Sequence, residues 1–244
     1  MTALSLMNGN VFQSSLVRAR RLAFSLVELL VVISIIGILA AMLLPTLARS
    51  KEKAYQATCI NNLKQLGYAI NMFADDHEQR LPGPAWQGVY EIYNDETERL
   101  PFYLTTYLDL PAPSPQGRVA KICICPAAAV KNKPPTPGEA LESLVRPISY
   151  LASAEVTNSL SDSITRPFGY PYSSKFYRLP KGPDEPPKKV TEIKGPSSSW
   201  AITDIDQENG FPGGYYYAFL SATKVHVTLR NRLFFDWHVA AAKD

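Results

Sequence analysis

A long apolar stretch near the N-terminus restricts what this chain of 244 residues can form. Residues 29–48 carry no charge and are rich in Leu, Ile and Val. At about 1.5 Å per residue, a helix of this length spans roughly 30 Å, the thickness of a bilayer core. Arg18, Arg20 and Arg21 precede it, which predicts a cytoplasmic N-terminus and an outer domain beyond the membrane. A secretory signal peptide has the same layout and is the alternative.

The composition restricts the function classes further. Apolar residues make up 46% of the chain and charged residues 19%, a globular balance that excludes disorder of the whole chain. The formal net charge of +3 is supplied by the three arginines before residue 24, so the rest of the chain is neutral. A nucleic-acid-binding domain would carry excess positive charge on its folded part, so we expect no nucleic-acid partner.

Glu28 is the one acidic residue within this apolar region. Insertion scales put the cost of a carboxylate at the middle of a membrane helix at about 2.5–3.5 kcal/mol, so a cationic partner is expected. Cleavage between Ala23 and Phe24 would create such a partner. The freed α-amine of Phe24 would lie about one helical turn from Glu28, or within reach of Glu28 in a neighbouring copy.

The segment AFSLVELLVV, residues 23–32, resembles the N-terminal signature of type IV prepilins and type II secretion pseudopilins. In that family a prepilin peptidase removes a basic leader after a glycine and methylates the new N-terminal residue. The resemblance implies that Ala23 ends the leader, that Phe24 becomes the methylated terminus and that Glu28 is the family's acidic residue. Ala23 replaces the family's glycine, and we expect cleavage to persist because alanine is the next smallest residue.

The apolar segment and the residues after it form one predicted helix from Phe24 to Asp75. Gly37 and Pro45 match small and helix-bending positions of the family. A proline inside a helix costs about 3 kcal/mol, so Pro45 predicts a bend where the membrane segment ends. The later half carries a single apolar stripe with spacings of three and four, which predicts a face packed on a core. The stripe consists of Ile60, Leu63, Leu66, Ile70 and Phe73, and the residues predicted on the other faces are Asn61, Asn62, Lys64, Gln65 and Asn71.

A second resemblance lies in the same helix. The segment ATCINNLKQLG, residues 57–67, is similar to a branch of pilin-like proteins that also have a C-terminal His, nine residues and then Asp-Gly. Phe73, Asp75 and Asp76 fill the places of that branch's aromatic residue and acidic pair. His226 and Asp236 fit the C-terminal motif. Trp237 replaces its glycine.

The last quarter of the chain predicts antiparallel strands. Its β-rich runs are separated by turn signals and cover residues 199–205, 215–220, 224–229 and 233–240. If residues 230–232 form a three-residue turn, His226 and Asp236 face each other across two strands, about 5 Å apart at Cβ. We interpret them as a structural pair that locks the hairpin, with a catalytic or metal-binding dyad as the less favoured alternative.

These elements predict an α+β, pilin-like fold in which a long N-terminal helix packs on a C-terminal antiparallel sheet. The first half of the helix spans the membrane. The expected organisation is a leader peptide at 1–23, a transmembrane assembly helix at 24–48, its amphipathic continuation at 49–76 and an outer domain at 77–244.

The three cysteines allow two interpretations. An oxidising location favours a disulfide between Cys59 and either Cys123 or Cys125, which would tie the helix to the sheet. The resemblance places Cys59 and the Cys-Pro step among the branch's recurring features. One residue between Cys123 and Cys125 is too few for a common zinc knuckle. A composite metal site with Cys59, His226 and His238 is the less favoured alternative.

Asp204, Asp206 and Glu208 place oxygen ligands at alternate positions, as a calcium loop does. The glycine at position 210 comes one place too late for an EF-hand. Major pseudopilins bind calcium in a C-terminal loop, so the resemblance keeps calcium as a possible ligand. An acidic β-turn is the preferred interpretation.

No enzyme signature is present, neither a phosphate-binding glycine loop nor Gly-x-Ser-x-Gly nor His-Glu-x-x-His. The resemblance implies a non-enzymatic structural subunit of a type II secretion pseudopilus or a type IV pilus-like filament. Its partners would be the prepilin peptidase, other pilin copies, an inner-membrane assembly platform and the lipid bilayer. It would cross the inner membrane once before assembly. The alternative is a membrane-anchored binding module or hydrolase that uses a pilin-like leader for export.

Overall fold

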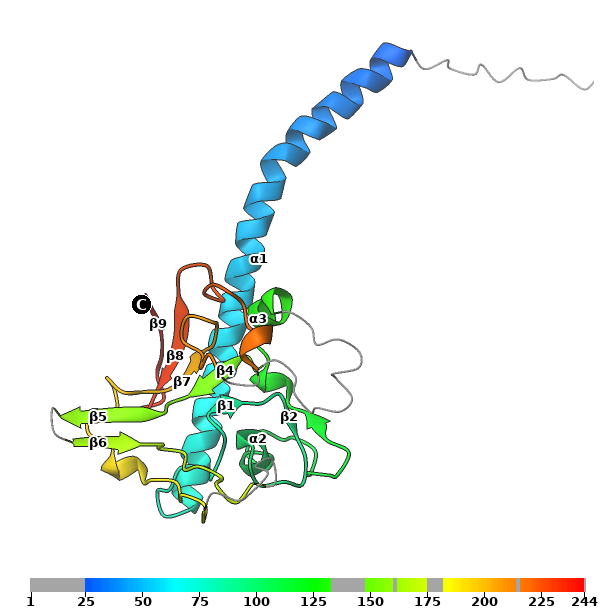
Figure 1. Cartoon of the computed structure of the whole chain (residues 1–244). Helices are drawn as coiled ribbons and strands as arrows, with labels where there is room; N and C mark the ends of the chain where they lie inside the picture. Colours follow the sequence, from blue (N-terminus) through cyan, green and yellow to red (C-terminus); the bar gives the residue numbers. More distant parts are fainter. Residues whose placement is uncertain (1–24, 133–147, 160–161, 175–181, 214–215, 244) are drawn as a thin grey trace, which may run out of the picture. The chain divides into compact units, whose positions relative to one another are not determined.

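The computed structural model describes residues 25–132, 148–159, 162–174, 182–213 and 216–243. The chain divides into two compact units, Met1–Leu47 and Ala48–Asp244. Helix α1, Leu26–Asp76, contributes residues to both units (Figure 1). Pro45 lies inside this helix, and the bend expected there stays a prediction.

The second unit contains a five-stranded antiparallel sheet with the strand order β1-β4-β7-β8-β9. Its strands are β1 Gly88–Val89, β4 Tyr150–Ala152, β7 Trp200–Asp204, β8 Arg230–Phe234 and β9 Val239–Ala242. Two strands far apart in sequence, β4 and β7, are hydrogen-bonded neighbours.

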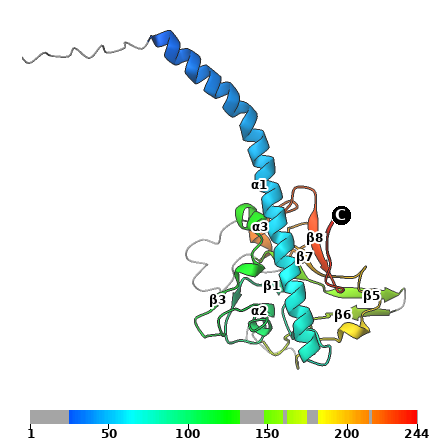
Figure 2. The ribbon, with the colours of Figure 1, turned by 180° about the vertical axis from the view of Figure 1, so that it is seen from behind.

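The second half of α1 covers one face of this sheet. In Figure 1 it passes behind the central strands, and in Figure 2, seen from behind, it lies in front of them. Leu63, Leu66 and Ile70 of α1 are fully buried and share one hydrophobic core with Ile202 of β7 and Leu233 of β8. This arrangement confirms the predicted α+β fold, a long helix on an antiparallel sheet.

The buried face of α1 follows the predicted stripe with two differences. Ile60 is only half-buried, and Cys59 is fully buried beside it. Asn62, predicted on a polar face, is buried, and its amide Nδ2 donates to the carbonyl of Ile124 at 2.9 Å. The hydrogen bond gives the buried amide a partner, which hydrophobic periodicity alone does not reveal.

Gly67 allows α1 to approach the β8–β9 hairpin closely. A Cβ at this position would lie 2.8 Å from Cδ1 of Leu233 and 3.5 Å from Cβ of Trp237. Trp237 lies in the hairpin turn and adopts a left-handed backbone with φ of 68°, a conformation that favours glycine. The position that matches the branch's glycine therefore has a left-handed backbone in this chain, although a tryptophan occupies it.

The structure corrects the predicted strands of the last quarter. The run at 199–205 corresponds to β7, but 215–220 contains the short 3₁₀ helix η3, Tyr217–Phe219. The run at 224–229 forms turns instead of a strand. The run at 233–240 contains the turn between β8 and β9. A continuous β-rich segment does not reveal where a hairpin reverses, because alternation looks the same on both strands.

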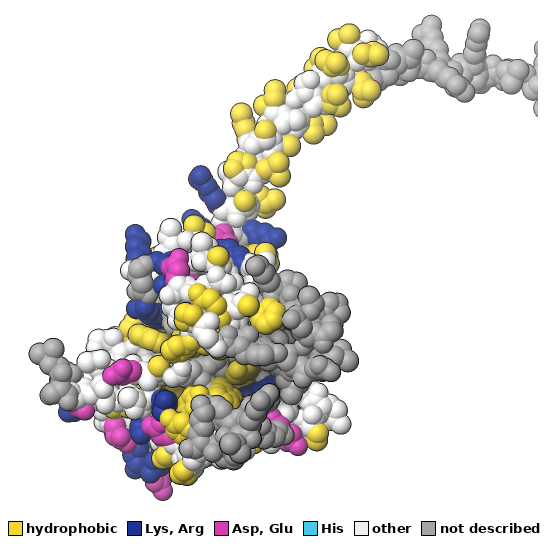
Figure 3. Space-filling view, in the orientation of Figure 1, with side chains coloured by type: hydrophobic (Ala, Val, Ile, Leu, Met, Phe, Trp, Pro, Cys, Tyr) yellow, Lys and Arg dark blue, Asp and Glu magenta, His cyan; other side chains and the backbone are white. Residues whose placement is uncertain are grey.

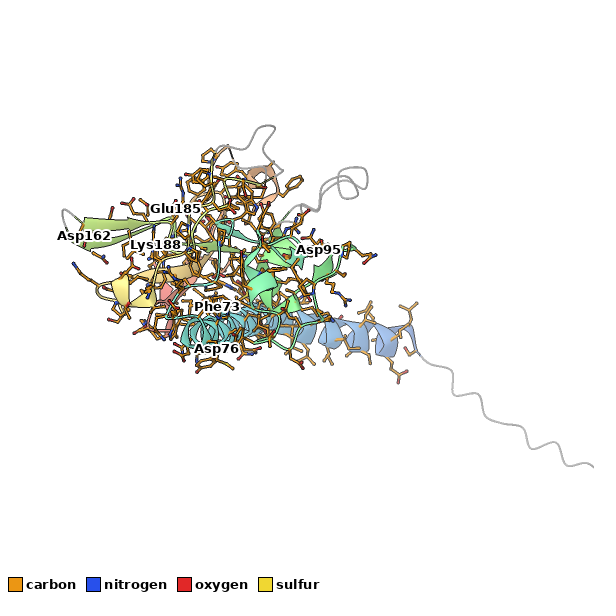
Figure 4. The ribbon with its side chains drawn as sticks, turned by 90° about the horizontal axis from the view of Figure 1, so that it is seen from below. Phe73, Asp76, Asp95, Asp162, Glu185 and Lys188 are labelled. Atoms are coloured by element: carbon orange, nitrogen blue, oxygen red, sulfur yellow. A yellow bond between two sulfur atoms is a disulfide. The ribbon has the colours of Figure 1, made fainter. Side chains whose placement is uncertain are left out.

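Smaller elements surround the core. They are the strand pairs β2 Ile92–Tyr93 with β3 Arg118–Val119 and β5 Glu155–Ser159 with β6 Asp162–Thr165, the helices α2 Leu100–Tyr103 and α3 Pro126–Lys131, and the 3₁₀ helices η1 Lys121–Cys123 and η2 Val190–Glu192. Figure 4 labels Phe73 near the end of α1, where its ring stacks on His77 at 3.9 Å. Glu185 forms ion pairs with Arg166 and Lys188 at 3.1 and 3.2 Å.

Substitution of Gly67 by Val tests the close approach of α1 to the hairpin. We expect Gly67→Val to lower the free energy of unfolding of the second unit by roughly 1–3 kcal/mol, because the new side chain overpacks Leu233 and Trp237. Thermal unfolding in detergent measures the change. Gly37→Val is the matched control, since a Cβ at Gly37 meets no atom within 4 Å in the structure. Equal melting temperatures for the two variants would contradict the packing.

Candidate functional site

The first part of α1 presents apolar side chains without a covering partner in the described chain. Every residue from 25 to 50 is exposed, and Leu26, the most exposed large apolar residue, keeps 78% of its surface. Apolar side chains line this part of the helix in Figure 3. Among the described residues, α1 is the one helix long and apolar enough to cross a membrane.

Glu28 caps the start of this helix. Its Oε2 accepts the backbone N–H of Ser25 at 2.9 Å, and Oγ of Ser25 accepts the N–H of Val27 at 3.3 Å. This is a variant of the capping box, in which Glu28 satisfies the backbone donor of Ser25 while Ser25 satisfies that of Val27 in place of Glu28. The carboxylate of Glu28 therefore points to the N-terminal end of the helix, where it binds Ser25, the residue that follows Phe24 in the sequence. Ala23 and Phe24 lie outside the described residues.

Gly37 and Pro45 both lie on the exposed part of α1. Ser34 is the polar side chain between them and Glu28, and its Oγ donates to the carbonyl of Leu30 at 2.7 Å. This bond stays within the helix, so Ser34 needs no partner elsewhere. The exposed apolar part of α1, residues 26–47, contains one acidic residue, Glu28.

Cys59 of α1 forms a disulfide with Cys125, the residue before α3. The bond joins two fully buried residues that are 66 positions apart. It ties α1 to the start of α3, not to the sheet as the sequence suggested. Cys123 is a free, fully buried thiol, and burial raises its pKa.

His226 is buried beside the disulfide and does not pair with Asp236. Its Nε2 lies 3.5 Å from Sγ of Cys125 and 3.5 Å from Oδ2 of Asp204, and its Nδ1 lies 3.6 Å from Oε1 of Glu52. Burial lowers the pKa of His226, and the nearby carboxylate of Glu52 opposes that shift. The imidazole thus lies among groups from α1, β7 and the loop before α3.

The predicted cross-strand pair of His226 and Asp236 is wrong because the hairpin turns later than expected. Residues 230–232 belong to β8, and Arg230 pairs with Ala242 in β9. Asp236 lies in the exposed turn, where Oδ1 accepts a hydrogen bond from the backbone N–H of His238 and contacts its ring. Trp237 donates its backbone N–H to the carbonyl of Phe234 in the same turn.

The acidic loop that suggested calcium binds an arginine of the chain itself. Arg230 of β8 donates from Nε and Nη2 to the two carboxylate oxygens of Asp206, both at 2.7 Å. Nη2 also donates to Oε2 of Glu208 at 2.9 Å. Asp206 is fully buried, so this bidentate pair provides the positive charge that the calcium interpretation assigned to a metal. Calcium binding at these residues stays a prediction, and a bound ion would have to displace Arg230 from the carboxylates.

Asp204, the third residue of that prediction, makes its own contacts in the buried region. Its Oδ2 accepts the backbone N–H of Asn231 at 2.6 Å and approaches His226. The side chain is fully buried, and desolvation raises the pKa of Asp204 to about 7, an effect that the bond from Asn231 partly opposes. A buried carboxyl that ionises near neutral pH makes the local charge sensitive to pH.

Three residues of this buried region were not predicted from the sequence to lie together. Arg230 was assigned to a turn, and Asp204 was assigned to a calcium loop. Glu52 was not singled out, although it precedes Cys59 by seven residues and so lies on the same face of α1, two turns earlier. That spacing is the signal that could have found it.

The N-terminal part of the chain matches a known family. The family described as "Prokaryotic N-terminal methylation motif" matches residues 18–44. Residues 18–44 are a prepilin-type methylation motif. This match covers the three arginines, Ala23, Phe24 and Glu28. The motif ends within the exposed part of α1.

The relatives of this motif-bearing chain agree in their names. Type II secretion system core protein G of Aeromonas hydrophila is 37% identical over 80 residues, which are 33% of this chain and 54% of that protein. The protein of the same name from Escherichia coli K12 is 36% identical over 90 residues, 32% of this chain and 62% of its own. The protein of the same name from Klebsiella pneumoniae is 37% identical over 60 residues, which are 25% of this chain and 43% of that protein.

The chain spans about half the length of the curated relatives it matches. No solved structure matches it. The likeness to known proteins therefore concerns the methylation motif and about a third of the chain.

The raised pKa of Asp204 predicts how its stabilising effect depends on pH. Between about pH 4 and 7 the folded chain keeps a proton on Asp204 that the unfolded chain releases, since an unperturbed aspartate has a pKa of about 3.9. The stabilisation from this proton is fully present below about pH 4 and is lost as the pH rises to about 7. Asp204→Asn removes this dependence.

We expect Asp204→Asn to gain stability relative to the unsubstituted protein as the pH rises from 4.5 to 7.5, by an amount on the order of a few kcal/mol. Urea unfolding at several pH values measures the difference. His226, whose pKa is lowered, acts in the opposite direction and lies 3.5 Å from Oδ2 of Asp204, so the same comparison in the His226→Gln background separates its contribution. A stability difference that stays constant over this range would show that Asp204 does not titrate there.

Proposed function

We propose that the protein is a structural subunit of a type II secretion pseudopilus, assembled through the apolar segment of α1. The observation that carries the proposal is the methylation motif at the head of a helix whose residues 25–50 are all exposed. An apolar surface of this length needs a lipid or protein environment. The relatives named as type II secretion core proteins support the pseudopilus over a surface pilus.

Processing comes first in this function. A prepilin peptidase cuts the membrane-stored precursor between Ala23 and Phe24 and methylates the new terminus. Before the cut, the arginines of the leader keep the N-terminus in the cytoplasm. After it, residues 24–48 anchor the chain in the inner membrane and the second unit lies beyond the membrane. An inner-membrane assembly platform then moves the subunit into the filament.

Assembly buries the apolar segment of one copy against those of its neighbours. The carboxylate of Glu28 enters this apolar core and needs a positive partner, because an unpaired buried charge costs several kcal/mol. The α-amine of Phe24 in a neighbouring copy supplies it. The capping box supports this role, since Glu28 already points to the end of the helix where that amine is created. The pair offsets burial and fixes the axial register of the subunits.

The mature N-terminus is the first test of this proposal. We expect mass spectrometry of the membrane-extracted protein to find a chain that begins with N-methylated Phe24. An expression host without a prepilin peptidase is the control, and there the leader is expected to remain attached. A start beyond Leu47 would identify an ordinary signal peptide, and an unprocessed functional chain would exclude the proposed assembly.

Replacement of the acid tests the assembly step. We expect Glu28→Val to remain membrane-bound and cleaved but to lose filament assembly at least 10-fold, because the α-amine of Phe24 is then left without its partner. Shearing followed by sedimentation and immunoblotting measures assembly. Ser34→Val is the matched control, since Ser34 lies on the same apolar segment and bonds only the carbonyl of Leu30 in the structure. Normal filaments from Glu28→Val would refute the electrostatic mechanism.

A further inference from the structure

The disulfide between Cys59 and Cys125 lies beside a third residue that can bind a metal, His226. Cys59, Cys125 and His226 are all buried, and one ligand atom of each lies within 4.8 Å of the others. They come from three separate segments: α1, the loop before α3, and the turn before β8. A disulfide requires only the two sulfur atoms, so it does not explain why a histidine is buried beside them.

The imidazole of His226 is directed at two possible metal ligands. Its Nε2 lies 3.5 Å from Sγ of Cys125 and 3.5 Å from Oδ2 of Asp204. In a tetrahedral zinc site with a Zn–S bond of about 2.3 Å and a Zn–N bond of about 2.0 Å, the nitrogen and sulfur ligands lie about 3.5 Å apart. His226 and Cys125 already have the separation that a shared zinc ion requires.

Polar atoms in this region lack hydrogen bonds within the described chain. They are Nδ1 of His226, Oε1 of Glu52 and Oδ1 of Asp204, all inaccessible to solvent. Leaving such a buried atom unpaired costs about 1–3 kcal/mol. His226 and Asp204 are 4% and 0% exposed, so water from outside does not reach them. The cluster is therefore incomplete when its sulfurs are joined to each other.

A zinc ion would use these atoms. Metal bound at Nε2 places the proton of His226 on Nδ1, which faces Oε1 of Glu52 at 3.6 Å. Metal-bound histidines commonly donate their other N–H to a carboxylate, which fixes the ring and raises its basicity. Nδ1 of His226 would then donate a hydrogen bond to Oε1 of Glu52, so that both atoms gain a partner. Lys131, with Nζ 3.8 Å from the same oxygen, balances the charge of Glu52.

We propose that the reduced form of this chain binds one Zn²⁺ through Cys59, Cys125, His226 and Asp204, with Glu52 orienting the histidine. Two thiolates, one imidazole and one carboxylate supply four ligands of the types that bind zinc, the number that a closed tetrahedral site requires. The zinc and the disulfide exclude each other because both use the same two sulfurs. Either one joins α1 to the start of α3. This inference does not depend on the proposed filament function.

The composite site considered from the sequence differs in its members. Cys123 is buried near Glu91 and is not one of the residues whose ligand atoms cluster with those of His226 in the described chain. His238 lies in the exposed β8–β9 turn with Asp236. Asp204 takes the fourth position instead. These two excluded residues supply matched controls, one cysteine and one histidine, for the residues that bind.

The experiment begins with the full-length protein in detergent under argon, reduced with a tertiary phosphine that is then removed. The phosphine takes the oxygen of one water and becomes the phosphine oxide, while the S–S bond gains two electrons and the two protons of that water to give two thiols. Zn²⁺ is added and displaces the two thiol protons, and the bound metal is measured after gel filtration. Co²⁺ serves as the spectroscopic probe.

We expect one bound Zn²⁺ per reduced chain and none above background in the oxidised chain. The Co²⁺ form should show tetrahedral d–d bands and a thiolate charge-transfer intensity that corresponds to two sulfurs. His226→Gln should abolish stoichiometric binding, and Glu52→Gln should weaken it by about 10-fold to 100-fold. Cys123→Ser and His238→Gln should bind as the unsubstituted protein does.

Several results would overturn the site. A reduced chain that keeps its near-ultraviolet circular dichroism but binds no zinc has no such site. Binding that survives His226→Gln, or that is lost in Cys123→Ser, places the metal elsewhere. A Co²⁺ spectrum with one or three thiolates contradicts the ligand set even where a cysteine variant fails to fold, because it is measured on the unsubstituted protein.

Discussion

Burial of one face of α1 against the five-stranded sheet is the constraint on which the second unit depends. Leu63, Leu66 and Ile70 provide apolar surface that the short strands lack, since β1 has two residues and β4 three. Gly67 lets the helix approach Leu233 closely. Without this helix, strands of such length would not bury enough surface to be stable.

The charged groups in this core are arranged around the same sheet. Arg230 of β8 pairs with Asp206 and Glu208 in the loop after β7, while Asp204 at the end of β7 approaches His226. A buried bidentate pair adds little net stability over apolar packing, but loss of one member leaves an uncompensated charge. The ion pair of Arg230 with Asp206 therefore fixes the position of the loop after β7 against β8 and adds little to the stability of the core.

The two halves of α1 solve different physical problems with one continuous helix. After Cys59 the helix has an apolar stripe that packs within its own chain, whereas before Arg49 it exposes apolar side chains on all sides. Such a segment gains stability only from lipid or from other copies of itself. Glu28 places a carboxylate on that otherwise apolar surface, and the capping box directs this carboxylate to the N-terminal end of the helix.

The sequence by itself determined the long helix, its apolar stripe, the acid at position 28 and the α+β class, because each follows from local periodicity or a contiguous motif. Tertiary structure decided the rest. It chose Cys125 over Cys123 as the partner of Cys59, placed the β8–β9 turn at Asp236, paired Arg230 with the acidic loop and directed His226 toward Asp204. These contacts join residues far apart in the chain, and the packing that selects among them leaves no periodic signal in the sequence.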